Sequence, residues 1–305
     1  MSAKIRAVLI TCLVALLAIG TAAQNRPAAG STAKPGAASD TTDRAKVIRA
    51  AADALGMIRW SDIGAGATRL PGIDVVNTME FFAAGADSSS GQPVQTEYHV
   101  AIGYNPAAMR MEMTRTGAGP QHSIQTVREN YAWDESELGA GLVAGKGTAT
   151  PQASAVKDRS LRLWTLPYGV VRAAVVAGDK ASVSTEGGNT VLTFPLTGPL
   201  AGVTVKATLD AKNFITKVET RPDNAAQTNL ATETEYSDYA DHGEILTDIK
   251  SPGHIVRKQG GRTVMDIRVK NWESNNPYLV FPVPANVKTA SASAGSDSGG
   301  TTARR

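Results

Sequence analysis

The chain has very little cysteine: Cys12 is the single one among 305 residues, and it lies inside an apolar N-terminal segment. If that segment is removed on export, the mature protein has no cysteine. This excludes disulfides, thiol catalysis and cysteine-bound zinc. Lipid attachment at Cys12 is the other interpretation, but Thr11 before it and apolar residues continuing to Ile19 fit that reaction poorly. Stability must therefore come from packing.

Aromatic residues are also scarce, at 5% of the chain, although 42% of its residues are hydrophobic. The core must then consist mainly of Val, Ile, Leu and Ala. Charge is nearly balanced, with 31 basic and 28 acidic residues and a net charge of +3. Without Lys4 and Arg6 of the N-terminal segment it becomes 3 − 2 = +1. No basic stripe is present, so nothing indicates nucleic-acid binding.

The sequence contains no recognisable catalytic or metal-binding pattern. A glycine-rich run at Gly139–Thr148 fails the phosphate-loop pattern, because Ala140 and Gly147 stand where glycine and Ser or Thr are needed. Asp297–Gly300 copies a protease nucleophile tetrapeptide, but nothing follows it that could form an oxyanion hole. No two histidines have zinc-site spacing; they are His99, His122, His242 and His254. We therefore predict no enzymatic activity, no cofactor and no metal.

The first 23 residues have the pattern of a secretory signal peptide. Lys4 and Arg6 precede a mostly apolar run from Ala7 to Ile19, and small residues lead to a cleavage site near Ala23. The run is shorter than the roughly 20 residues that a bilayer requires, which disfavours a membrane anchor. We expect a periplasmic or secreted protein that does not span a membrane after signal cleavage.

Composition divides the rest of the chain into three parts. Residues 24–41 are rich in Ala, Gly, Pro and Ser, which predicts a disordered linker. Residues 42–288 carry the periodic patterns of a single β-rich domain. Residues 289–305 are rich in Ser, Gly, Ala and Thr, which predicts a disordered tail.

The longest regular pattern is the stretch from Val203 to Glu273. It alternates apolar and polar residues with the period of half-buried strands, and Gly260-Gly261 is a hairpin signal. No helical pattern interrupts it, so the sheet should be antiparallel. Further strands are expected at residues 73–82, 95–104, 108–115, 125–133, 180–185, 190–195 and 278–282.

Three helical segments accompany these strands. The first is Asp43–Leu55, ended by Gly56, and the others are Ser154–Leu166 and Val170–Ala177, separated by Pro167. The last two are apolar on more than one side, so they should cover a sheet. The fold class is therefore mainly β (α+β): a large curved antiparallel sheet or half-barrel with helices on its concave face. Such a curve makes an apolar groove.

Met109, Met111 and Met113 fall on one face of an expected strand. Methionine adapts to apolar ligands of variable shape, although ordinary core packing explains the row as well. We predict that the groove binds a hydrophobic ligand. Its candidate ligand-binding residues, whose sheet faces are not assigned, are Val76, Phe82, Met109, Met111, Met113, Trp133, Trp164, Leu209 and Phe281.

The order of these features resembles the periplasmic lipoprotein-carrier superfamily, the LolA/LolB/LppX-like fold. That resemblance implies a groove for acyl chains of lipoproteins or lipids. Over most of residues 43–285, short phrases are also similar to the β-rich N-terminal domain of some secreted metallo-β-lactamase-fold proteins. The His-x-His-x-Asp-His motif of the hydrolase domain is absent, so hydrolysis is not implied. The phrases are Ala54–Gly56, Asn130–Trp133, Trp164–Gly169, Tyr236–Tyr239 and Lys258–Gly261.

Three hypotheses follow. The first is an exported, non-catalytic binding protein for a lipid, acyl chain or lipoprotein, which requires an apolar cavity beneath the helices of residues 154–177. The second is a structural or accessory module that binds a protein partner in the cell envelope, with a filled core and an exposed apolar patch or sheet edge. The third is a hydrolase using Glu233 and Glu235, which requires a polar cleft around them.

Overall fold

The computed structural model describes residues 41–58, 60–63, 66–69, 76–116, 121–241 and 248–296. The predicted signal peptide with Cys12 and its cleavage site lies outside the described residues. So do residues 24–40 of the predicted linker and residues 297–305 of the predicted tail.

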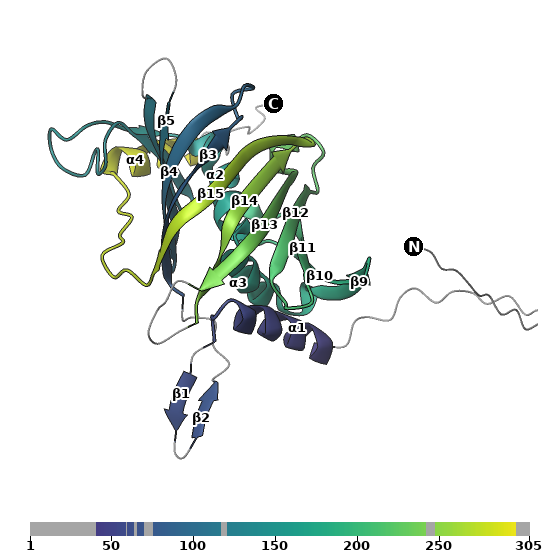
Figure 1. Ribbon diagram of the computed structural model, residues 1–305. Coiled ribbons are helices and arrows are strands. Elements are labelled where there is room, and N and C mark those ends of the chain that lie inside the picture. Colours follow the sequence, from purple (N-terminus) through teal and green to yellow (C-terminus); the bar gives the residue numbers. More distant parts are fainter. Residues whose placement is uncertain are drawn as a thin grey trace, which may run out of the picture. The chain divides into compact units, whose positions relative to one another are not determined.

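The dominant element is one antiparallel sheet of thirteen strands that curves without closing (Figure 1). Its strand order is β8-β7-β6-β5-β4-β3-β15-β14-β13-β12-β11-β10-β9. The predicted mainly β, curved antiparallel fold is confirmed. The strands are β3 (Thr78–Asp87), β4 (Val94–Tyr104), β5 (Ala107–Arg115), β6 (Gln121–Arg128), β7 (Tyr131–Glu135), β8 (Ala149–Pro151), β9 (Ser182–Glu186), β10 (Asn189–Pro195), β11 (Val203–Leu209), β12 (Ile215–Pro222), β13 (Thr232–Asp241), β14 (Lys250–Gln259) and β15 (Arg262–Ser274).

The strand order divides the sheet into two meanders, β3–β8 and β9–β15. Within each meander, neighbours in the sheet are neighbours in the sequence. The meanders join where β3 pairs with β15, with Met79 opposite Ser274 and Asp87 opposite Met265. Since β8 and β9 are the two edges of the sheet, the chain between them must cross its whole width.

Helices α2 (Val156–Thr165) and α3 (Pro167–Ala177) lie in this crossing segment, inside the curve of the sheet (Figure 1). Pro167 is the first residue of α3, where its missing N–H costs no hydrogen bond. Gly169 permits the tight junction, because a Cβ there would lie 2.5 Å from the carbonyl oxygen of Leu163. Helix α1 (Thr41–Ala54) packs beside α3, and α4 (Ala285–Ser296) packs against β7 and β8. Every helix in the described part of the chain is too short or too polar to cross a bilayer.

The main core fills the space between the concave face of the sheet and helices α1, α2 and α3. Two small clusters lie apart from it. One contains Ala101, Ala108 and Phe281, and the other contains Trp133 and Val287. Because strand side chains alternate between faces, these two clusters occupy the convex face.

Several element boundaries differ from those predicted. The strand expected at 73–82 is β3, which runs on to Asp87; residues 73–75 lie outside the described part. A strand pair, β1 (Trp60–Ile63) and β2 (Gly66–Arg69), was not predicted. The extended segment expected at 278–282 pairs with no strand, and α4 covers residues 289–296 of the segment predicted to be a disordered tail.

Candidate functional site

A cavity of about 130 Å³ lies between α2 and the concave face of the sheet. Its walls come from β3, β4 and β5 on one side and β13, β14 and β15 on the other, so it straddles the junction of the two meanders. Apolar side chains dominate these walls, among them Phe81, Val100, Leu166, Ile255 and Ile267. The cavity thus lies beneath the helical segment where a ligand groove was predicted.

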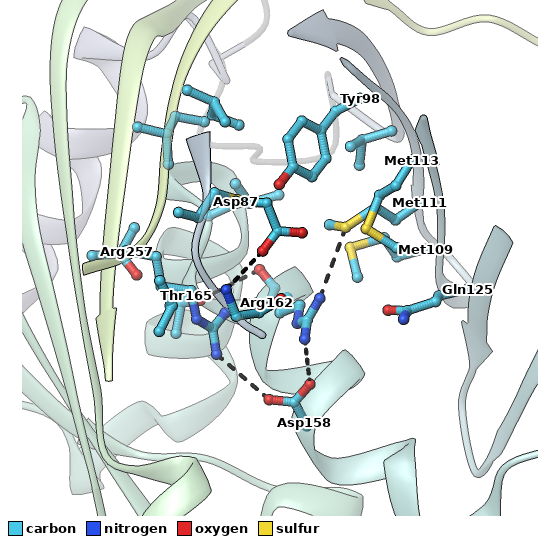
Figure 2. Close-up of a pocket in the computed structure, with 18 of the residues that line it drawn as sticks. Asp87, Tyr98, Met109, Met111, Met113, Gln125, Asp158, Arg162, Thr165 and Arg257 are labelled. Carbon is cyan, nitrogen blue, oxygen red and sulfur yellow. Dashed lines mark hydrogen bonds and ion pairs between the residues drawn. The ribbon is translucent and has the colours of Figure 1, made fainter. Parts of the chain in front are cut away.

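The methionine row of β5 forms one wall of the cavity. Met109, Met111 and Met113 are buried, line the cavity and alternate with outward-facing residues along the strand. Figure 2 shows all three side chains on the same side of the cavity. Thioethers are flexible and polarisable, so this wall can repack around different apolar shapes.

A cluster of three charged side chains lies beside the methionine wall. Its centre is Asp158, which lies between two arginines (Figure 2). Asp158 and Arg162 are one turn apart on α2, and Arg162 Nη2 donates to Asp158 Oδ2 at 2.8 Å. Arg257 Nη2, from β14, is 3.7 Å from the other carboxylate oxygen of Asp158. Arg162 Nη1 also lies 3.8 Å from the sulfur of Met111. Polar and apolar parts of the cavity are therefore in direct contact.

A second charged pair in the lining, Arg115 and Asp87, is joined by two hydrogen bonds and neutralises its own charge. Arg115 donates to Asp87 Oδ2 through Nη2 at 2.7 Å and through Nε at 3.2 Å. Burial alone would raise the pKa of the Asp87 carboxyl, but hydrogen bonds from Ser89 and Arg115 and the Arg115 charge lower it overall. This carboxylate is satisfied and stays ionised.

Arg257 is buried, and its guanidinium lacks a close hydrogen-bonded partner, such as Arg115 has in Asp87, among the described residues. Only 8% of the residue's surface is exposed. Burial, and after it the like charge of Arg162, lower the pKa of Arg257 to about 10, although the Asp158 carboxylate opposes both effects. The guanidinium therefore remains protonated at neutral pH, but in a setting that compensates its charge poorly.

A second cavity, of about 300 Å³, lies on the other side of α2, against α3 and the 3-10 turn at Gly198–Leu200. Trp164 and Leu163 of α2 line it together with Val176 of α3. In the part of the chain that the structure describes, its lining contains one ionisable residue, Glu129. The second cavity is therefore mostly apolar, and its described lining has no cluster of charged side chains like the one around Asp158.

The structure brings only some of the predicted ligand residues together. Met109, Met111 and Met113 line the first cavity, and Trp164 lines the second. Val76 and Leu209 are fully buried in the main core and line neither cavity.

The other three predicted residues lie on the convex face. Phe82 is 41% exposed and stacks on His99, while Phe81 beside it faces the cavity. Phe281 packs on Ala101 and Ala108, and Trp133 is buried beneath α4. None of the three lines either cavity. The strand period places Phe82 and Trp133 on the opposite side of the sheet from α2, and Phe281, which lies in no strand, packs on that same side.

The sequence reasoning missed the charged residues of the first cavity: Asp158, Arg162 and Arg257. A signal was present. Arg257 stands two residues after Ile255, which places a charge on the inward face of an alternating strand. An inward charge needs a partner, and the Asp158–Arg162 pair on α2 supplies one.

Glu233 and Glu235, the basis of the hydrolase hypothesis, point away from the cavities. Both contact Lys258 Nζ, at 2.9 Å and 2.6 Å. Hydrogen bonds to Glu235 and then Glu233 raise the pKa of Lys258 to about 12. Neither acid lines the two cavities described here, and the described residues hold no cluster of three or more His, Asp or Glu that could bind a metal.

Comparison with known proteins shows a distant structural likeness and no relative in sequence. No protein-family model matches the chain, and no curated protein matches it in sequence. Among solved structures, a DUF1329 family protein from Desulfovibrio piger superposes with a TM-score of 0.41 and 9% identity. The match covers 79% of this chain and 95% of that chain. The function proposed for this chain therefore depends on its own site.

Proposed function

We propose that this chain is an exported, non-catalytic binding protein that holds an apolar ligand, such as a lipid or acyl chain, between α2 and the concave face of its sheet. The observation that carries the proposal is the methionine-lined cavity beneath α2. It occurs where a curved sheet covered by helices provides a ligand groove.

The cavity volume limits how much ligand fits as the structure stands. At about 130 Å³ it is close to the ~150 Å³ that suffices to hold benzene in an apolar cavity. About six carbons of a chain would fit, and burying them offers about 5 kcal/mol at ~0.8 kcal/mol per methylene. Costs of association reduce this figure. A longer chain requires movement of the methionine side chains.

The accessory-module alternative has a separate observation in its favour. The loop after β7 exposes Leu138, Leu142 and Val143, the last to 62%. Exposed large apolar side chains close in sequence favour a protein contact. If that alternative holds, changing Val143 to a charged residue abolishes partner capture and leaves uptake of apolar ligands intact.

The experiment that tests the binding function is native mass spectrometry of the protein isolated from its own cell envelope, with organic extraction of what co-purifies. We expect a bound acyl or lipid species that is lost in Met111→Asp, because a charge in the methionine wall opposes apolar burial. Met111→Leu, which conserves volume, should retain it. Isolation of an empty protein that also fails to take up a hydrophobic fluorescent probe would contradict the proposal.

A further inference from the structure

The charges lining the first cavity do not balance. Three arginines line it, Arg115, Arg162 and Arg257, against two carboxylates, Asp87 and Asp158. Asp87 and Arg115 neutralise each other in a closed pair. Arg162 and Arg257 then share the single carboxylate of Asp158. Among the described residues that line it, the cavity carries one net positive charge.

These two arginines also have hydrogen-bond donors to spare. The guanidinium of Arg257 has no hydrogen-bond partner among the described residues, since its 3.7 Å contact with Asp158 is too long for one. The Nε of Arg162 is buried and has no partner in the same part of the chain. A guanidinium carries five N–H donors, and buried donors are normally satisfied. Both arginines lie beside the Asp158 carboxylate and keep unused N–H donors. There is therefore a place beside Asp158 for a second hydrogen-bond acceptor.

The chemistry of that acceptor follows from the donors. Guanidinium groups present paired N–H donors that match carboxylate and phosphate oxygens. Arg162 touches Met111, so an acceptor beside the arginines stands next to the methionine wall. A molecule that satisfies both parts has an anionic group at one end and an apolar chain at the other.

We propose that the ligand of this cavity is an anionic amphiphile, whose carboxylate or phosphate binds Arg162 and Arg257 while its chain lies along Met109, Met111 and Met113. The inference rests on the proposed binding function and adds the chemistry of the head group. Asp158 then acts as a stand-in anion, which holds the arginines in place and competes with the ligand's head.

The test is calorimetric titration with three eight-carbon probes that share a tail: octanoate, octanol and octyltrimethylammonium. Acetate and inorganic phosphate serve as head groups without a tail. We expect octanoate to bind at least tenfold more tightly than octanol, and the cation and the two free anions to bind weakly. Methyl-13C methionine spectra report whether the β5 row senses the tail.

Variants of the charged residues sharpen this test. Arg257→Met should lower octanoate affinity at least tenfold and leave octanol affinity within twofold. Lys258→Met removes the same charge from the opposite face of β14 and should change neither. Asp158→Asn removes the competing carboxylate and should tighten octanoate severalfold. This gain does not depend on whether Arg257→Met folds.

The outcomes separate the head-group inference from the binding function. If octanol and octanoate bind equally well, or if Asp158→Asn weakens octanoate, the anionic head is wrong and the apolar binding function stands. If no eight-carbon probe binds, both fail. If acetate or phosphate binds as tightly as octanoate with the same arginine dependence, the site takes a free anion, and the amphiphile is wrong.

Discussion

His99 shows how a single residue on the convex face is tied to its neighbours. Its Nε2 lies 2.6 Å from Glu80 Oε1, and its Nδ1 lies 3.3 Å from Glu112 Oε1. Phe82 stacks on the imidazole at a centroid distance of 4.3 Å. The hydrogen bond with Glu112 raises the pKa of His99 most strongly; burial opposes this, and Glu80 adds to it.

A pH dependence of stability follows. Because the folded pKa of His99 lies above the ordinary value of 6.5, its contribution is fully present below pH 6.5 and is lost as pH rises through the raised pKa. The free energy of unfolding should fall by about 0.5–1 kcal/mol over this range, since the pair is partly exposed. Urea unfolding at pH 6 and pH 8.5 measures the difference. The fall should be absent in His99→Gln, and the same pH dependence of the unfolding free energy in both proteins would disprove the prediction.

The period of a strand predicts which side chains share a face, but it leaves open which face is inside. Met109, Met111 and Met113 could be placed together from the sequence, and they do line one wall. Phe82 and Trp133 were also predicted to bind the ligand, yet both lie on the convex face, where Phe82 is exposed and Trp133 is buried under α4. Only the position of the covering helices distinguishes the two faces, and that position is a long-range property.

Helix α2 forms the roof of the first cavity, and Arg159 fastens it to the sheet. The side chain is buried, and its Nη1 donates to the carbonyl oxygens of Trp133 at 2.6 Å and Thr126 at 3.1 Å. Its Nη2 contacts Asp134 at 2.5 Å. One residue thus joins α2 to both β6 and β7.

Loss of this anchor should be costly. Arg159→Met leaves two strand carbonyl oxygens without their partner, and we expect the free energy of unfolding to fall by about 2–3 kcal/mol. Arg162→Met, on the same helix but with a partly exposed side chain, should cost under about 1 kcal/mol. Chemical denaturation of both variants measures the difference. Equal losses would show that Arg159 does not anchor the helix.

Local patterns were sufficient to predict the fold class and several hairpins, because each hairpin forms between neighbours in the sequence. They missed the β1–β2 pair, and the single strand expected at residues 125–133 is the hairpin of β6 and β7. Local patterns were insufficient for the arrangement of the whole sheet. The pairing of β3 with β15 joins residues nearly the full domain apart, such as Met79 and Ser274. It is also the seam over which the first cavity forms. The charged part of the site joins Asp158 and Arg162 of α2 to Arg257 of β14, so it forms only where α2 packs across the sheet.

An open sheet must protect two edges from pairing with other chains. The β9 edge is short and mostly exposed, and its residues are Ser, Thr, Val and Glu. The β8 edge is only three residues long and is covered by α4. Asn286 Nδ2 donates to the carbonyl oxygen of Ala149 at 2.7 Å, and Val287 is buried beside Trp133.

A chain ending at Pro284 should therefore be less stable than the full chain and should associate more readily through the β8 edge. Without α4, the β8 edge and the indole of Trp133 become accessible, so we expect red-shifted tryptophan emission and concentration-dependent dimers in light scattering. Val287→Asp in the full chain should reproduce the stability loss, at about 2–4 kcal/mol. Val280→Asp, at a position 65% exposed, should not. A shortened chain that associates no more than the full chain would mean that the shortness of β8, and not α4, protects this edge.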